Sequence, residues 1–436
     1  MLEAWHRTGT TGAGVGMVER LSEEYVSFMA NRITTNGSVH LQRNKTTAKR
    51  RREARGKTLN FRSSAPEVQK GLLESRAKEW KKWCEFNAAE PIMGKPLQEL
   101  LDEGHKALPM QWIETDKNDH LRVPGGPAIE PLYKSRLVAR GDLETADVRT
   151  DSPTCDLEAQ NMIFSFAASM NLDICSADIT NAYFQGNELD RLMLFKQPPG
   201  GLPGLPEEAH LVARVPIYGT RDAGRGFWKK LREVILKCGM TENQVLKATY
   251  SIEENGKILA ILGTHVDDIL WATVPEKQHV IDAILEKFKC GTQEKRNFRY
   301  CGKEVRQSDD FSIKVTCSDT TLKMTPIRIA PTRRNNEAIN DSERTQLKSV
   351  AGSLQWIARQ CRPDLCYRVS RLQSVAATAT VRDLRDANKI VDYAKVTHSN
   401  GLTFKSGLLD WDTMVMCVIT DASHGNELEY NEVKKL

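Results

Sequence analysis

The segment Lys257-Ile-Leu-Ala-Ile-Leu-Gly-Thr-His-Val-Asp-Asp-Ile-Leu-Trp-Ala-Thr273 is apolar almost throughout, apart from two adjacent acids near its centre. The apolar residues run up to Asp267 and Asp268 and resume directly after them. This pattern predicts a β-hairpin that carries the acid pair near its tip and packs both strands against the rest of the protein. An Asp-Asp pair is common at ordinary turns, but carboxylates between buried strands need cations to offset the cost of burial. The segment therefore indicates a metal site.

A third acid, Asp178, closes the shorter apolar segment Leu172-Asp-Ile-Cys-Ser-Ala-Asp178. We expect this segment to be a strand beside the hairpin. Three carboxylates on neighbouring strands can hold two Mg²⁺ ions about 3.5–4 Å apart, the arrangement used for in-line displacement at phosphorus. Magnesium prefers oxygen ligands, and Mn²⁺ is the expected substitute. Asp178, Asp267 and Asp268 are therefore candidate metal-binding and catalytic residues.

The other segments mix predicted helices with hairpins and lack a regular βαβ alternation, which is typical of an α+β fold. Residues 110–114 and 133–140 flank a polar loop rich in glycine and proline, which predicts a second hairpin. A polar stretch covers residues 290–345. Helices are expected in residues 66–84, 157–172, 227–238 and 346–398, and a final strand in residues 413–420, before Asp421.

The N-terminal 65 residues are expected to be disordered, since residues 43–57 contain eight lysines and arginines and cannot contribute to a core. This basic segment is a solvated linker, a nucleic-acid-binding tail or a nuclear localisation signal. The net charge of +5 is too small to identify a polyanionic partner by itself. We expect neither a signal peptide nor a membrane span. The ten cysteines lack zinc-ligand spacing, which favours reduced thiols in a protein that is not secreted.

Several motifs follow one another in an order that resembles the reverse transcriptase region of copia-type LTR retrotransposon Pol polyproteins. The resemblance covers residues from about 130 to 425. Its motifs are Tyr133–Gly141, Asp178 with Ala182-Tyr183-Phe184, Gln197-Pro-Pro-Gly200, Tyr218–Trp228, His265-Val-Asp-Asp268, and Gly352–Ile357 with Arg362-Pro-Asp364.

The resemblance implies a right-hand polymerase that copies RNA into DNA. Fingers and palm would occupy residues 108–290, after a helical lead-in over 66–107, and a small thumb and connection would occupy 291–410. Residues 411–436 resemble the truncated start of a ribonuclease H domain with Asp421 as a vestigial acid, and no ribonuclease H activity is expected. The chain is therefore expected to be a fragment of a polyprotein.

The resemblance also implies roles for individual residues around the nucleotide. Asp178, Asp267 and Asp268 would bind two Mg²⁺ ions, and the carbonyl of Ile179 would help to hold one ion. Nucleotide-binding roles fall on Arg136, which would grip the triphosphate, Tyr183, which would exclude a ribose 2′-hydroxyl, and Asp222.

Two departures from the resembled family bear on activity. His265 stands where the family usually has tyrosine, and Asp222 where it has a glutamine that contacts the nucleotide. An aspartate there faces a triphosphate with like charge, so activity is expected to be reduced unless Arg221 or Arg225 compensates. The alternative is a catalytically inactive remnant that still binds nucleic acid. An unrelated two-metal nuclease is disfavoured because it would need neither Arg136 nor Tyr183.

The expected partners are an RNA template, a DNA primer, their RNA/DNA hybrid and deoxynucleotides. The remainder of the polyprotein or a second copy of the chain could also bind. The resemblance implies a location in cytoplasmic virus-like particles, while the basic segment 43–57 could direct the chain to the nucleus.

Overall fold

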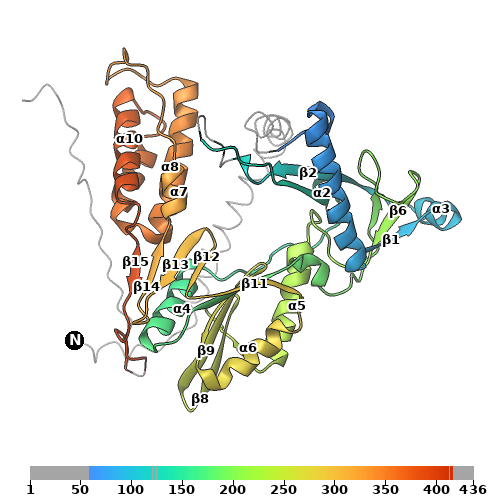
Figure 1. The fold of residues 1–436 in the computed structure, drawn as a ribbon, viewed down its shortest axis with the longest axis horizontal. Coiled ribbons are helices and arrows are strands. Elements are labelled where there is room, and N and C mark those ends of the chain that lie inside the picture. Colours follow the sequence, from blue (N-terminus) through green and yellow to red (C-terminus); the bar gives the residue numbers. More distant parts are fainter. Residues whose placement is uncertain (1–57, 120–121, 123–125, 412, 416–436) are drawn as a thin grey trace, which may run out of the picture. The chain divides into compact units, whose positions relative to one another are not determined.

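The computed structural model describes residues 58–119, 122, 126–411 and 413–415, and these form an α+β fold in two compact units. Of the described residues, those up to Thr145 and Asp190–Thr220 form the first unit, and Ala146–Leu189 and those from Arg221 onward form the second. Figure 1 shows sheets with helices packed on them in both units. The α+β prediction is confirmed. The predictions for residues 1–57 and for Asp421 lie outside the described residues, as does most of the strand expected over 413–420. Residues 58–65, also expected to be disordered, include the short helical turn Phe61–Ser63.

The first unit is built on a five-stranded sheet that includes the predicted second hairpin. Strands β2 and β3 pair antiparallel, β2 and β5 pair parallel, and the other neighbours pair antiparallel. In spatial order the strands are β1 (Ala89–Ile92), β6 (His210–Ala213), β5 (Leu194–Lys196), β2 (Leu108–Asp116) and β3 (Tyr133–Ala139).

Helix α2 (Pro66–Glu85) packs against β3 in this unit. Pro66 suits the first turn of the helix because its missing N–H has no intrahelical partner there. Leu72 and Trp83 are the buried apolar side chains of this helix. The hydroxyl of Ser75 accepts a hydrogen bond from the N–H of Ser135 at 2.7 Å, which ties the helix to the strand. The shorter elements of the unit are α3 (Gly94–Asp102), η1 (Phe61–Ser63) and η3 (Gly141–Leu143).

Residues 66–107 are therefore more than a helical lead-in. They include β1, which joins the sheet through β6, and α2, which covers β3. The segment belongs to the same compact unit as the β2–β3 hairpin. Sequence pattern missed β1 because Ala89-Glu-Pro-Ile92 is short and contains a proline, which is tolerated at the edge of a sheet.

The second unit is built on a six-stranded antiparallel sheet with helices on both faces. The predicted hairpin is confirmed as β9 and β10, and β4 lies beside β10. In spatial order the strands are β11 (Cys290–Lys295), β4 (Cys175–Ile179), β10 (Asp268–Thr273), β9 (Lys257–His265), β8 (Thr249–Glu254) and β7 (Thr241–Glu242).

Two hydrophobic cores enclose this sheet, which is why its central strands are apolar on both faces. Helix α4 (Leu157–Ser169) packs on one face with Ile261 and Leu270. Helices α5 (Ala223–Lys237) and α6 (Gln278–Leu285) pack on the other face with Leu262 and Ile269. Figure 1 shows these helices on opposite sides of the sheet.

The rest of the second unit is a smaller antiparallel sheet followed by a group of helices with its own core. Residues 290–345, predicted only as a polar stretch, contain most of this sheet. The strands are β12 (Asn297–Tyr300), β13 (Lys303–Gln307), β14 (Ile313–Thr316) and β15 (Leu402–Phe404). The helices are α7 (Ser318–Leu322), α8 (Asp341–Cys361), α9 (Cys366–Ser374) and α10 (Val381–Val396), and the short turns are η4 (Ala182–Gln185), η5 (Pro275–Lys277) and η6 (Pro363–Leu365). Within the described residues, no helix has the length and apolar character needed to cross a bilayer.

Candidate active site

Two of the predicted acids, Asp178 and Asp268, lie on neighbouring strands at one end of the six-stranded sheet, and Asp267 lies in the turn beside them. Asp268 is directly opposite Asp178 on β4, and it is also directly opposite His265 on β9. Directly opposed residues of antiparallel strands project from the same face. His265, Asp268 and Asp178 therefore form a row across one face of the sheet.

Asp267 occupies the two-residue turn between β9 and β10. Its carbonyl oxygen accepts a hydrogen bond from the N–H of Ile179 at 2.8 Å, so the turn is held against β4. Val266, the other turn residue, has a φ of +58°. This conformation is unfavourable for a β-branched residue, at a cost of about 1–3 kcal/mol. The strain is stored where the turn presents its acids.

The electrostatics of the site are those of a carboxylate cluster. Burial raises the pKa of Asp268 to about 6, and the negative charges of Asp267 and Asp178 act in the same direction. The ionised cluster would be stabilised by a cation, and its donor atoms are oxygens, which suit Mg²⁺. The residues present therefore fit the metal that the sequence predicts.

Gly291 on β11 faces Asp178, and sequence reasoning missed it. A Cβ atom at this position would lie 2.9 Å from Oδ2 of Asp178 and 2.9 Å from Oγ1 of Thr180. A larger residue would have to displace the carboxylate. No sequence signal distinguishes this glycine, because its partner lies on a distant segment.

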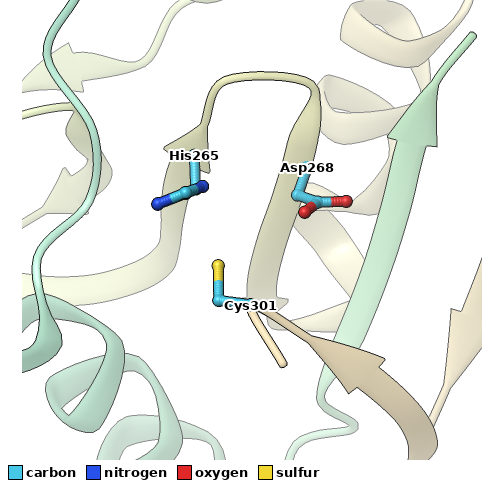
Figure 2. Close-up of side chains that lie close together, drawn as sticks. All are labelled: His265, Asp268 and Cys301. Atoms are coloured by element: carbon cyan, nitrogen blue, oxygen red, sulfur yellow. The ribbon is translucent and has the colours of Figure 1, made fainter. Parts of the chain in front are cut away.

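Cys301 is a second residue that sequence reasoning missed. It follows β12, whose Phe298 and Tyr300 pack with Leu270 on the face of the sheet that carries Asp178 and Asp268. One ligand atom each of His265, Asp268 and Cys301 lies within 4.8 Å of the other two. Figure 2 shows the three side chains gathered beside the tip of the hairpin. All three are half-buried.

Two of the predicted nucleotide-binding residues of the second unit, Tyr183 and Asp222, lie near the start of helix α5. Tyr183 lies in η4, packs against the core beneath the sheet, and has its hydroxyl 3.8 Å from the position of a Cβ atom on Gly224. Asp222 is the N-cap residue of α5, where a negative charge is favoured by the helix dipole. Ile179 is fully buried on β4. The structure thus brings Tyr183 close to the α5 terminus.

Arg136 lies in the first unit, on β3 opposite Ile113. Its guanidinium carbon is 5.6 Å from the ring centroid of Tyr218, and its side chain is exposed. The ring of Tyr218 belongs to another motif of the predicted family, and Gly219 holds that motif against β3. Gly219 has a φ of +95°, and a Cβ atom there would lie 2.2 Å from the carbonyl oxygen of Ala139.

Comparison with known proteins identifies the family. The family described as "Reverse transcriptase (RNA-dependent DNA polymerase)" matches residues 99–317, which is 219 of 436 residues. The chain is 25% identical over 317 residues to the Retrovirus-related Pol polyprotein from transposon RE2 of Arabidopsis thaliana, covering 68% of this chain and 21% of that protein. It is 25% identical over 294 residues to the Pol polyprotein from transposon RE1 of the same plant, covering 63% of this chain and 20% of that protein.

Shorter relatives and solved structures also match. The putative transposon Ty5-1 protein of Saccharomyces cerevisiae is 23% identical over 259 residues, covering 56% of this chain and 82% of that protein. A foamy viral protease–reverse transcriptase in complex with double-stranded DNA aligns with a TM-score of 0.38 and 14% identity. The alignment covers 80% of this chain and 62% of that chain. The chain spans about a fifth of the length of the RE1 and RE2 polyproteins. It belongs to the reverse transcriptase (RNA-dependent DNA polymerase) family, in the form found in copia-type retrotransposon Pol polyproteins.

Proposed function

We propose that this chain is an RNA-directed DNA polymerase that adds deoxynucleotides to a primer. The observation that carries the proposal is the pairing of Asp268 with Asp178 across β10 and β4, with Asp267 in the adjoining turn. Two facing carboxylates and a third beside them would hold two Mg²⁺ ions. Such ions, when bound, supply charge for the α-phosphate and a lower pKa for the primer 3′-hydroxyl.

The protein's own residues would position the nucleotide. Arg136 carries an exposed guanidinium whose planar fork matches phosphate oxygens. The ring of Tyr183, held between the core and the start of α5, would exclude a ribose 2′-hydroxyl. The carbonyl of Ile179 would add an oxygen ligand. In this proposal the first unit contains the fingers, and the second contains the palm and the thumb or connection.

Asp222 favours a second candidate, a catalytically inactive remnant that still binds nucleic acid. Its carboxylate lies at the start of α5, near Tyr183, where the triphosphate is expected. Of the two arginines that could compensate, Arg225 donates a hydrogen bond to Asp151 at 2.7 Å and Arg221 donates one to the carbonyl of Ala146 at 2.9 Å. Either arginine would have to give up a contact to reach a phosphate.

Incorporation of dTTP on an RNA template with a DNA primer tests the first candidate against the second. We expect the full chain to extend the primer in Mg²⁺ and in Mn²⁺, and the Asp267→Asn/Asp268→Asn double variant to fail. Binding of the RNA/DNA hybrid should weaken steeply as salt increases, because phosphate contacts release counterions. Salt-sensitive binding without any incorporation would support the inactive remnant.

The cellular setting is part of the proposal. The chain would work within cytoplasmic virus-like particles, in the nucleus, or in both, together with the rest of a polyprotein or a second copy of itself. Fractionation of cells that express the tagged chain, with and without residues 43–57, would measure how much the basic segment contributes to nuclear entry.

A further inference from the structure

The end of the hairpin carries a second candidate set of metal ligands, which shares Asp268 with the carboxylates Asp178 and Asp267 but adds an imidazole and a thiol. His265 ends β9, Asp268 begins β10, and Cys301 follows β12. One ligand atom of each lies within 4.8 Å of the other two, and Figure 2 shows their side chains around a common space. The set therefore combines an imidazole, a carboxylate and a thiol from three chain segments.

This donor set suits zinc better than magnesium. Magnesium takes oxygen ligands, whereas imidazole and thiolate are preferred ligands of Zn²⁺. Zinc bonds of about 2.0–2.3 Å in a tetrahedron place neighbouring ligand atoms about 3.3–3.6 Å apart. Side-chain shifts of about 1 Å would bring atoms 4.8 Å apart to that spacing. Three protein ligands leave the fourth position for water.

The backbone supports such a site. His265 and Asp268 are a directly opposed pair at the end of the β9–β10 ladder, so their separation is fixed by strand pairing. Cys301 has a φ of +47° and is followed by Gly302 with a φ of +79°, so a tight bend presents the thiol. The bend is anchored by Tyr300, which is 1% exposed.

We propose that His265, Asp268 and Cys301 bind one Zn²⁺ ion, and that this ion withdraws Asp268 from the magnesium site. On binding, the Cys301 thiol releases its proton to solvent and coordinates as thiolate. Zinc binding is inferred from the positions of these three residues and does not depend on polymerase activity. Its consequence, inhibition of DNA synthesis by zinc, rests on the proposed polymerase function.

Binding is tested by titrating the full chain with Co²⁺, which replaces zinc and gives a near-ultraviolet thiolate-to-cobalt absorption band. We expect the band to saturate at one ion per chain and to disappear when Zn²⁺ is added. Cys301→Ser should lose the band, and His265→Tyr should weaken cobalt binding by at least about tenfold. Cys238→Ser is the matched control, since Cys238 is also half-buried but lies at the end of α5; it should keep the band.

A second measurement protects the test from a variant that fails to fold. Alkylation of the unaltered chain, mapped by mass spectrometry, should slow at Cys301 when Zn²⁺ is present and remain unchanged at Cys238. The proposal is overturned if the wild type gives no thiolate band, if Cys301→Ser keeps the band, or if zinc leaves the alkylation of Cys301 unchanged.

A polymerase assay then tests the consequence separately. Zinc inhibition is expressed relative to the activity of each variant without zinc. The concentration of Zn²⁺ that halves incorporation should rise at least about tenfold in Cys301→Ser. A chain that shows the cobalt band but no incorporation would retain the zinc site and refute the polymerase. Incorporation with equal zinc sensitivity in wild type and Cys301→Ser would refute the inhibitory role alone.

Discussion

The two hairpins that carry the proposed site residues differ in how far they remove charge from water. The hairpin β9–β10 lies between two cores, and its strands are buried on both faces except near the ends. The hairpin β2–β3 buries one face, where Ser135 contacts α2, and leaves Arg136 and Ile113 exposed on the other. The acids therefore interact strongly with one another, whereas the Arg136 side chain is exposed and contacts the ring of Tyr218.

This difference predicts two kinds of functional residue. Half-buried like charges raise the free energy of the metal-free fold, so the β9–β10 acids cost stability that a bound cation returns. An exposed arginine costs the fold almost nothing and can act only when substrate arrives. Substitution of an acid should therefore change both chemistry and stability, while substitution of Arg136 should change substrate affinity alone.

The largest expected effect comes from Asp268→Asn. The amide is a poor magnesium ligand, so dTTP incorporation should fall at least about 100-fold. Because the substitution also removes a half-buried negative charge, the melting temperature without metal should stay equal or rise. Primer extension and thermal unfolding in EDTA measure the two effects. Retained activity would show that Asp268 is not a catalytic residue. A lower melting temperature would show that its negative charge does not destabilise the metal-free fold.

Asp173→Asn is the matched control for this experiment. Asp173 precedes β4, and although burial opposes ionisation, hydrogen bonds from Lys295 and Arg296 hold its pKa below the ordinary value. Its carboxylate therefore stabilises the fold, unlike that of Asp268. The control should lower the melting temperature and leave most of the incorporation rate. If the two variants changed the melting temperature in the same direction, the ion pairs of Asp173 would not account for a difference in stability between the two acids.

Arg136→Ala is expected to raise the Michaelis constant for dTTP about tenfold and to leave the melting temperature unchanged. Arg136→Lys should fall between the wild type and Arg136→Ala, because lysine keeps the charge but loses the planar fork. Steady-state kinetics at several salt concentrations measure the effect. Arg306→Ala is the control, since Arg306 is also an exposed arginine on a strand. A melting temperature that falls in Arg136→Ala would show that the exposed hairpin face has a structural role.

Asp222→Gln tests a carboxylate at the start of a helix, a third kind of environment. Loss of the like charge should lower the Michaelis constant for dTTP about three- to tenfold, or about 0.7–1.4 kcal/mol. The helix should lose about 0.3–1 kcal/mol because the favourable charge at its N-terminus is gone. Asp222→Asn removes the same charge with a shorter amide. An unchanged Michaelis constant in both variants would show that Asp222 does not impair nucleotide binding.

The β9–β10 hairpin was predictable from sequence because a strand buried on both faces must be apolar without interruption. The sheet formed by β12–β15 was not. Its strands place polar residues inward: Lys303 is fully buried and its ammonium donates a hydrogen bond to Gln160. A buried lysine on β13 interrupts the alternation that would have marked the strand. Its partner is a residue of α4, which no local pattern reveals.

The same limit applies to the site. Asp178, Asp267 and Asp268 could be selected because each follows or interrupts an apolar segment. Cys301 and Gly291 carry no such signal, since each becomes significant only through a partner on another strand. The cysteine spacing argued against a zinc site, because that rule covers ligands that are close in sequence. Here the fold, and not the spacing, brings His265 and Cys301 together.

The smallest expected effect is a pH dependence that separates Asp268 from Asp173. The pKa of Asp268 is raised to about 6 in the folded chain, so between about pH 4 and 6 the unfolded chain releases a proton that the folded chain retains. Stability contributed by this carboxyl is therefore complete below about pH 4 and lost as the pH rises through about 6. Discounted for solvent screening, the loss is about 1 kcal/mol, or roughly 2–4 °C in melting temperature. In EDTA, the melting temperature of Asp268→Asn should therefore rise above that of the wild type by this amount between about pH 4 and 7, and Mg²⁺ should abolish the difference.

Asp173, whose pKa is lowered, contributes stability that is lost as the pH falls. The melting temperature of Asp173→Asn should therefore approach that of the wild type in acid. A margin for Asp268→Asn that is constant with pH, or that grows toward acid, would show that the acids at the hairpin tip are as well solvated as Arg136.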